Sequence, residues 1–187
     1  MGRRAFIGLS ASALAGAWLW LRRTSEPLNA DPVRPGQPKL VKIVNFTDAG
    51  VREGVVQVPK VVKSEDEWRK QLSPIAFEVT REEGTERAFT GATWNLHDKG
   101  LYRCICCDTA LYSSETKFES GTGWPSFWAP IARENIQQGD DESIGMSRTA
   151  VACRRCDAHL GHVFDDGPKP TGLRYCMNSA ALRFVKA

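Results

Sequence analysis

Apolar and polar positions alternate over short distances through much of this chain, which predicts short β-strands. Two stretches rich in β-branched residues, 40–46 and 51–58, flank a turn at 48–50 (DAG). Both stretches mix apolar with polar residues as half-buried strands do. We therefore expect a β-hairpin within residues 39–62 and, after Tyr102, further short strands separated by turn residues.

Two short helices are predicted directly after this hairpin. Ser64 and Glu67 have the spacing of a capping box, in which each residue accepts a hydrogen bond from the backbone N–H of the other. Pro74 suits the first turn of a second helix, which we expect to end near Gly84. Together with the later strands, these helices predict an α+β, mostly antiparallel β domain over residues 63–187.

Residues 1–23 have the pattern of a targeting segment. The segment 3–8 (RRAFIG) resembles a twin-arginine export signal, and an uncharged, largely apolar run extends from Ala5 to Leu21. Tryptophans in this run and arginines directly after it are typical of an interfacial anchor, which favours an uncleaved segment. Residues 24–38 contain four prolines and are interpreted as a stiff tether. The pattern predicts an exported, periplasmic domain anchored to the inner membrane.

Length and charge limit the remaining possibilities. A chain of 187 residues with 42% hydrophobic content is long enough for one modest core. Its formal net charge of +3 becomes −1 once the four arginines of the targeting segment are set aside. A basic surface for nucleic acid is therefore not supported, and we expect no nucleic-acid partner.

Four of the six cysteines form two Cys-x-x-Cys pairs, Cys104 with Cys107 and Cys153 with Cys156. Two such pairs on separate turns can offer zinc four thiolates at about 2.3 Å. A four-thiolate site leaves no position for substrate, so we expect one structural zinc ion. The alternatives are two disulfides or a redox-active pair, although neither pair opens a helix in a βαβ context.

Cys176 is a candidate nucleophile. If the segment 173–184 alternates as one strand, Arg174, Cys176 and Asn178 share a face, which is too polar for a core. A guanidinium beside a thiol favours the thiolate, so Arg174 is a candidate activator. The alternative is that Cys176 is a small buried core residue.

Two histidines precede a turn-rich stretch, 165–172 (DDGPKPTG), that should reverse the chain. His159 and His162 would then lie beside Cys176 on a neighbouring strand, as an acid/base group near a nucleophile. One of these histidines could instead be a buried core residue whose ring is hydrogen-bonded and has no catalytic role. A His-x-x-His zinc site is a further option, but no acidic third ligand has a suitable spacing.

Three segments, 121–127 (GTGWPSF), 159–164 (HLGHVF) and 172–179 (GLRYCMNS), resemble in sequence and order the signature blocks of the B-type methionine sulfoxide reductases. Segments 84–91 and 117–121 resemble that family too. The resemblance implies a twisted, open β-barrel-like (β-tent) domain. It also implies an oxidoreductase, a peptide-methionine (R)-S-oxide reductase that reduces the R epimer of methionine sulfoxide in oxidised proteins.

By this resemblance, Cys176 attacks the sulfoxide sulfur and becomes a sulfenic acid. The resemblance also implies that His159 and His162 supply the general acid and its hydrogen-bond support, with Arg174 and Asn178 lining the polar side. A zinc-ribbon binding module, in which Cys176 and the histidines are only structural, is the alternative from another functional class.

The family likeness assigns Trp124 to the methyl group of the substrate, whereas the indole could also simply anchor the turn before Pro125. Many members of the family carry a resolving cysteine where this chain has Thr122. We therefore expect an external, thioredoxin-like thiol to reduce the sulfenic acid. A disulfide between Cys106 and Cys176 is the alternative.

Overall fold

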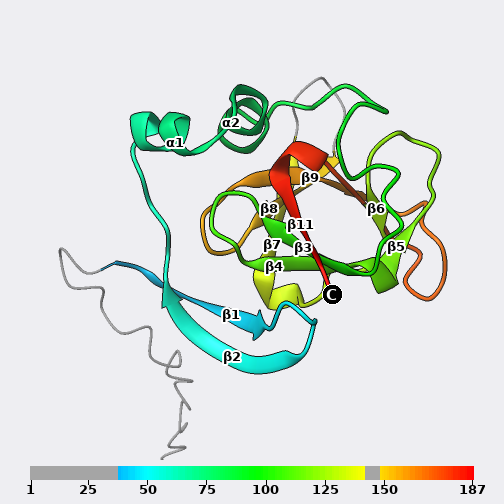
Figure 1. Ribbon diagram of the computed structural model, residues 1–187, viewed down its shortest axis with the longest axis horizontal. Coiled ribbons are helices and arrows are strands. Elements are labelled where there is room, and N and C mark those ends of the chain that lie inside the picture. The colour runs from blue at the N-terminus through cyan, green and yellow to red at the C-terminus, as the bar shows by residue number, and fades with distance from the viewer. Residues whose placement is uncertain (1–37, 142–147) are drawn as a thin grey trace, which may run out of the picture. The chain divides into compact units, whose positions relative to one another are not determined.

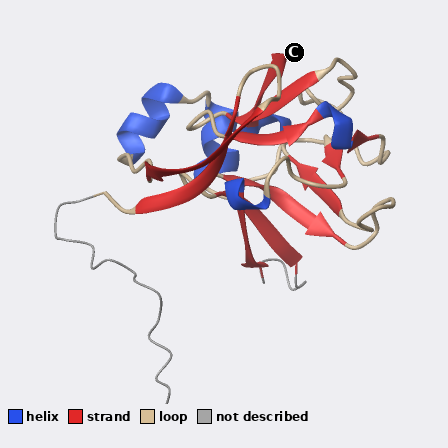
Figure 2. Ribbon diagram, turned by 90° about the horizontal axis from the view of Figure 1, so that it is seen from below, coloured by secondary structure: helices blue, strands red, loops and turns tan. Residues whose placement is uncertain are grey.

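The computed structural model describes residues 38–141 and 148–187, which form a mostly antiparallel β structure with two α-helices (Figures 1 and 2). Its strands form three open sheets, with the orders β1-β2, β5-β6-β10-β9-β8-β7 and β11-β3-β4. The expected α+β, mostly antiparallel and unclosed architecture is therefore confirmed. The predicted targeting segment and nearly all of the tether lie outside the described residues. No helix within the described ranges has the length and apolar character needed to cross a bilayer.

The predicted hairpin consists of β1 (Leu40–Phe46) and β2 (Arg52–Pro59). Gly50 supplies the left-handed backbone of its turn, with φ of +80°. Asn135 ties the hairpin to the rest of the fold, because its amide accepts from the N–H of Val44 and donates to the Val44 carbonyl. This buried side chain also donates to a carbonyl of β4 (Ala110–Ser113).

Both predicted helices are present, as α1 (Glu65–Gln71) and α2 (Pro74–Arg81). The capping box is formed as expected, since the Ser64 hydroxyl accepts from the Glu67 N–H and the Glu67 carboxylate accepts from the Ser64 N–H. Val79 of α2 is fully buried. The helix therefore packs its apolar face on the core, and it ends three residues before Gly84.

The remaining elements build the two larger sheets. The six-stranded sheet comprises β5 (Lys117–Phe118), β6 (Ser126–Phe127), β7 (Ile136–Asp141), β8 (Arg148–Cys153), β9 (His159–Phe164) and β10 (Arg174–Met177). The three-stranded sheet contains β3 (Gly100–Cys104), β4 and β11 (Leu182–Lys186). The two sheets share a core in which the rings of Tyr112 and Phe127 stack 4.4 Å apart. The Tyr112 hydroxyl donates to the Met177 sulfur at 3.1 Å, so it is not left unsatisfied.

The segment 173–184 is not the continuous strand that its alternation predicts. β10 ends at Met177, a 3₁₀ turn (η4, Ser179–Ala181) follows, and β11 joins a different sheet. Glu86 causes the break, because its carboxylate accepts from the N–H groups of Ser179 and Ala180 at 2.6 and 2.8 Å. The Asn178 amide oxygen in turn accepts from the Glu86 N–H. Asn178 therefore lies at the end of β10, in a clamp between distant segments.

Candidate active site and metal centre

The four paired cysteines meet in one cluster, and their sulfur atoms all lie within 4.8 Å of one another. They are Cys104, Cys107, Cys153 and Cys156. The two pairs occupy similar turns after β3 and β8. Asp108 donates its N–H to the Cys104 carbonyl and Asp157 donates to the Cys153 carbonyl, each with positive φ. Two equivalent turns thus present two thiols each to a common centre.

The sulfur–sulfur distances fit a tetrahedral metal site. Cys104 Sγ lies 3.6 Å from Cys156 Sγ, and Cys107 Sγ lies 3.5 Å from Cys153 Sγ. Four sulfurs at about 2.3 Å from a tetrahedral centre would be about 3.8 Å apart. A disulfide requires about 2.05 Å, so the observed spacing supports metal ligation instead. The cluster could therefore hold a metal ion.

The helices hold these cysteine turns in place. The Arg81 guanidinium of α2 donates to the Cys156 carbonyl at 2.9 Å, and the Gln71 amide of α1 donates to the Cys106 carbonyl at 2.8 Å. The Cys106 side chain is buried and donates its S–H to the Thr80 hydroxyl. The Cys106 side chain is thus buried against α2, beside the cysteine cluster.

Cys176 lies in the middle of β10, between β6 and β9. Its backbone partners are Ser126 on β6 and His162 on β9. The sequence-predicted placement of His162 beside the candidate nucleophile is therefore present. Gly161 makes this close pairing possible, because a Cβ at that position would lie 2.2 Å from the Cys176 carbonyl oxygen.

Burial controls the state of the Cys176 thiol. It raises the pKa of Cys176 above its ordinary value, although the Thr122 hydroxyl, the Arg174 guanidinium and the Ser126 hydroxyl act in the opposite direction. Arg174 is held by two hydrogen bonds of 2.8 Å to the Asp166 carboxylate. Arg174 is therefore near the thiol as predicted, but its charge does not outweigh burial.

His162 is fixed from its other side. Its Nε2 lies 2.7 Å from a carboxylate oxygen of Asp141, the last residue of β7. The same oxygen accepts from Arg148 at 2.9 Å. The His162 and Asp141 side chains are only 11% and 18% exposed, so this contact is shielded from solvent.

His159 shares the sheet face of His162 because of a β-bulge at Leu160. The register passes from Val151 opposite Gly161 to Ala152 opposite His159. The two imidazole rings meet edge to face, with centroids 5.2 Å apart. Burial lowers the pKa of His159 to about 4, and its buried Nε2 has no hydrogen-bond partner among the described residues.

A small pocket of about 120 Å³ opens above Cys176. Its lining residues are Thr85, Trp124, Arg148, Gly161, His162, Phe164, Cys176, Met177 and Asn178. The indole N–H of Trp124 donates to the Glu86 carbonyl at 3.1 Å, which fixes the ring as an apolar wall. His159 is not among these residues, so of the two predicted histidines only His162 faces the pocket.

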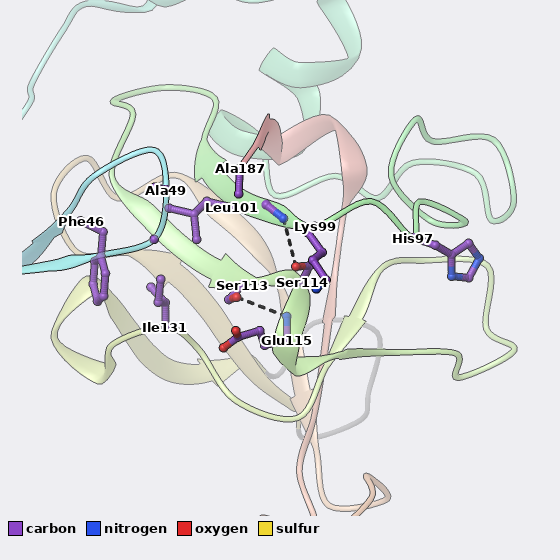
Figure 3. A pocket seen from close by; sticks show the side chains of 12 residues that line it. Phe46, Ala49, His97, Lys99, Leu101, Ser113, Ser114, Glu115, Ile131 and Ala187 are labelled. Atoms are coloured by element: carbon purple, nitrogen blue, oxygen red, sulfur yellow. Dashed lines mark hydrogen bonds between the residues drawn. The ribbon is translucent and has the colours of Figure 1, made fainter.

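A roomier hollow of about 660 Å³ lies elsewhere, between the β1–β2 turn and the strands β3 and β4 (Figure 3). Phe46, Leu101, Ile131 and Ala187 contribute to its walls, and the N–H of Gly100 donates to the Ser114 hydroxyl in it. No cysteine and no sequence-predicted site residue lines it. The chemistry therefore belongs to the smaller pocket.

The SelR domain model matches residues 72–186, which include the cysteine cluster and the pocket. The chain belongs to the SelR family. Curated relatives include the peptide methionine sulfoxide reductase MsrB of Synechococcus sp. (strain RCC307), 59% identical over 124 residues that cover 66% of this chain and 91% of that protein. The MsrB of Hahella chejuensis is 56% identical over 128 residues, 68% of this chain and 92% of its own. The chloroplastic peptide methionine sulfoxide reductase B1 of Arabidopsis thaliana is 58% identical over 120 residues, 64% of this chain and 59% of its own. The MsrB resemblance drawn from the sequence blocks is confirmed, and the zinc-ribbon alternative gains no support.

Two acidic residues of this SelR site were not predicted from the sequence. Asp166 lies in the turn-rich stretch, whose sequence indicates only a chain reversal, yet it orients Arg174. Asp141 ends a strand that carries no motif, and only the pairing of β7 with β8 and β9 brings it to His162. The sequence therefore does not predict that Asp141 lies beside the candidate general acid His162, because the two residues are far apart along the chain.

Proposed function

We propose that this chain reduces methionine-R-sulfoxide in proteins to methionine. The observation that carries the proposal is the cross-strand pair of Cys176 and His162 at a small pocket with Trp124 as its apolar wall. A nucleophile, a proton donor and an apolar wall are the three groups that a methyl sulfoxide requires. The names of the SelR relatives support the same reaction.

In the proposed step, the Cys176 sulfur attacks the sulfoxide sulfur while the sulfoxide oxygen receives a proton. The oxygen then passes to the Cys176 sulfur as the S–O bond of the substrate breaks. The transient bond between the two sulfurs also breaks, so the sulfide product leaves and Cys176 carries the oxygen as a sulfenic acid. The thiol is thereby oxidised by two electrons and the sulfoxide reduced by two. His162 is the proposed proton donor, because it is the cross-strand neighbour of Cys176 and lines the pocket, and buried His159 supports its ring from the edge.

Selectivity for one epimer would follow from the fixed walls of the pocket. If the methyl group packs on Trp124 and the oxygen points towards His162, two of the substituents at sulfur are fixed. The two epimers then differ in where the lone pair points, and only one of them directs it away from Cys176, as the attack requires. Asn178 lines the polar side of the pocket, whereas Arg174 is outside the lining and acts on the Cys176 thiol. Burying one methyl group contributes only about 1 kcal/mol, so its role is orientation rather than affinity.

Regeneration of Cys176 requires two equivalents of an external thiol, which form a disulfide and water as the sulfenic acid returns to a thiol. Thr122 cannot form a disulfide. The S–H of Cys106 is buried and donates to Thr80, which supports an external, thioredoxin-like reductant over a Cys106–Cys176 disulfide.

The metal of the four-cysteine cluster is proposed to be a single structural zinc ion. Cys104, Cys107, Cys153 and Cys156 would hold it as a closed four-thiolate site, where it would stabilise the fold. Zinc would not take part in the reaction, because the thiolates leave no position for substrate.

For location, we propose export by the twin-arginine route and retention at the inner membrane, with the catalytic domain in the periplasm. The twin arginines and the apolar run from Ala5 to Leu21 support this proposal. Replacing Arg3 and Arg4 by lysine should leave the protein in the cytoplasmic fraction. A normally exported double variant would contradict the proposed route.

The reaction is tested by offering both epimers of a methionine sulfoxide peptide together with a dithiol reductant. The R epimer should be consumed and the S epimer should remain. Equal consumption of the two epimers would contradict the proposed pocket geometry.

A further inference from the structure

A carboxylate contacts the proposed proton donor from the side opposite the nucleophile strand. Asp141 accepts from His162 Nε2 at 2.7 Å and from Arg148 at 2.9 Å, through the same oxygen. Asp141 and Arg148 are cross-strand partners at the ends of β7 and β8, whereas His162 reaches the carboxylate from β9. Three strands therefore converge on one charged, partly buried group.

The Asp141 carboxylate determines which ring nitrogen of His162 carries the hydrogen. An ionised carboxylate only accepts hydrogen bonds, so the Nε2 that contacts it must carry a hydrogen. In the neutral imidazole the lone pair is then on Nδ1, and Nδ1 is the nitrogen left to exchange a proton. Arg148 in turn restrains Asp141, because it donates to the carboxylate oxygen that His162 also contacts.

We propose that Asp141 is a positioning residue for sulfoxide reduction, which holds His162 in one ring orientation as the Nε2–H tautomer. This inference rests on the proposed function only for its catalytic consequence. His162 Nδ1 takes the thiol proton as the Cys176 thiolate forms and passes it to the sulfoxide oxygen, while the Nε2–H bond to Asp141 is retained. Asp141 balances the positive charge of the imidazolium form, as the buried carboxylate does in hydrolytic triads.

A purely structural role is the competing explanation, because Asp141 also pairs with Arg148 at the end of the β7–β8 hairpin. That role needs no contact with His162. The variant Asp141→Asn separates the two, because its amide can still hydrogen-bond to Arg148 but can also donate to Nε2 and permit the other tautomer. Asp140→Asn is the matched control, since Asp140 precedes it on the same strand and is exposed.

The experiment measures steady-state turnover of methionine-R-sulfoxide and the ¹⁵N shifts of the His162 ring in both variants. The chain has three histidines, so His97→Gln and His159→Gln assign the signals. Asp141→Asn should lower kcat about 100-fold with little change in KM, which is the size expected when a general acid is misplaced. His162 should change from the Nε2–H tautomer towards Nδ1–H, while Asp140→Asn should match the unmodified protein in both measurements.

Two results would overturn the inference. One is an Asp141→Asn variant with unchanged kcat, and the other is His162 in the Nδ1–H form in the unmodified protein. The tautomer in the unmodified protein decides the matter if the variant does not fold. Because the ring shifts are measured without substrate, an Nε2–H tautomer in a protein that does not reduce the sulfoxide would refute the proposed function and leave the Asp141–His162 contact standing.

Discussion

The hydroxyl oxygen of Thr122 lies 3.8 Å from the sulfur of Cys176, although 54 residues separate them in the sequence. Positive φ angles at Gly121 and Gly123 turn the chain sharply on either side of Thr122. The pairing of Ser126 with Cys176 then brings this loop beside the nucleophile. Thr122 thus occupies a position from which a second thiol could reach Cys176, and it is chemically unable to serve as one.

Thr122→Cys should convert the site to internal regeneration. After one turnover without reductant, mass spectrometry should find a trappable sulfenic acid on Cys176 in the unmodified protein. The variant should contain a disulfide between Cys176 and the introduced thiol, since small movements suffice to bring the sulfurs together. Cys106→Ser is the control and should behave like the unmodified protein. A Cys106–Cys176 disulfide in the unmodified protein would contradict external regeneration.

Removal of any one metal ligand should lower zinc content and melting temperature together. Cys107→Ser is a suitable variant, because metal-binding free energy is folding free energy in such sites. We expect less than one zinc ion per chain and a melting temperature lower by at least about 10 °C. Cys106→Ser, in the same turn, should keep the metal. A zinc-free preparation with unchanged stability and activity would refute the structural-zinc proposal.

His159 should make stability depend on pH. Burial lowers its pKa in the folded protein to about 4, below the value of about 6.5 expected in the unfolded chain. The unfolded chain therefore binds the proton more readily, so stability present above about pH 6.5 is lost as pH falls towards about 4, by about 3 kcal/mol in total. The free energy of unfolding of the zinc-loaded protein should fall more steeply over this range than that of His159→Gln. Parallel curves for the two proteins would show that His159 is not held neutral by burial.

Features encoded within a few residues were predictable from the sequence. The capping box of Ser64 and Glu67, the hairpin and the two Cys-x-x-Cys turns depend on local spacing, and each is present. The break at Asn178 was not predictable in the same way, because the carboxylate that causes it belongs to Glu86, 93 residues before its partner Ser179. A long-range contact there outweighs the local alternation.

In the candidate site, too, some features follow from the local sequence and others only from long-range contacts. Alternation and chain reversal predicted His162 beside Cys176, and β9 and β10 pair in that register. The position of His159 on the same sheet face as His162 depends on a bulge, and the contact of Asp141 with His162 depends on the register of β7 and β8. The net effect of burial on the Cys176 thiol also required the folded structure, because Arg174 alone suggests the opposite direction.

The most direct test of the central claim is a single-turnover assay of unmodified protein and Cys176→Ser with a methionine-R-sulfoxide peptide and no reductant. The unmodified protein should form about one equivalent of methionine per active site, with a sulfenic acid on Cys176. Cys176→Ser should form none while retaining its zinc and its melting temperature. Undiminished methionine formation by Cys176→Ser would contradict the assignment of Cys176 as the nucleophile.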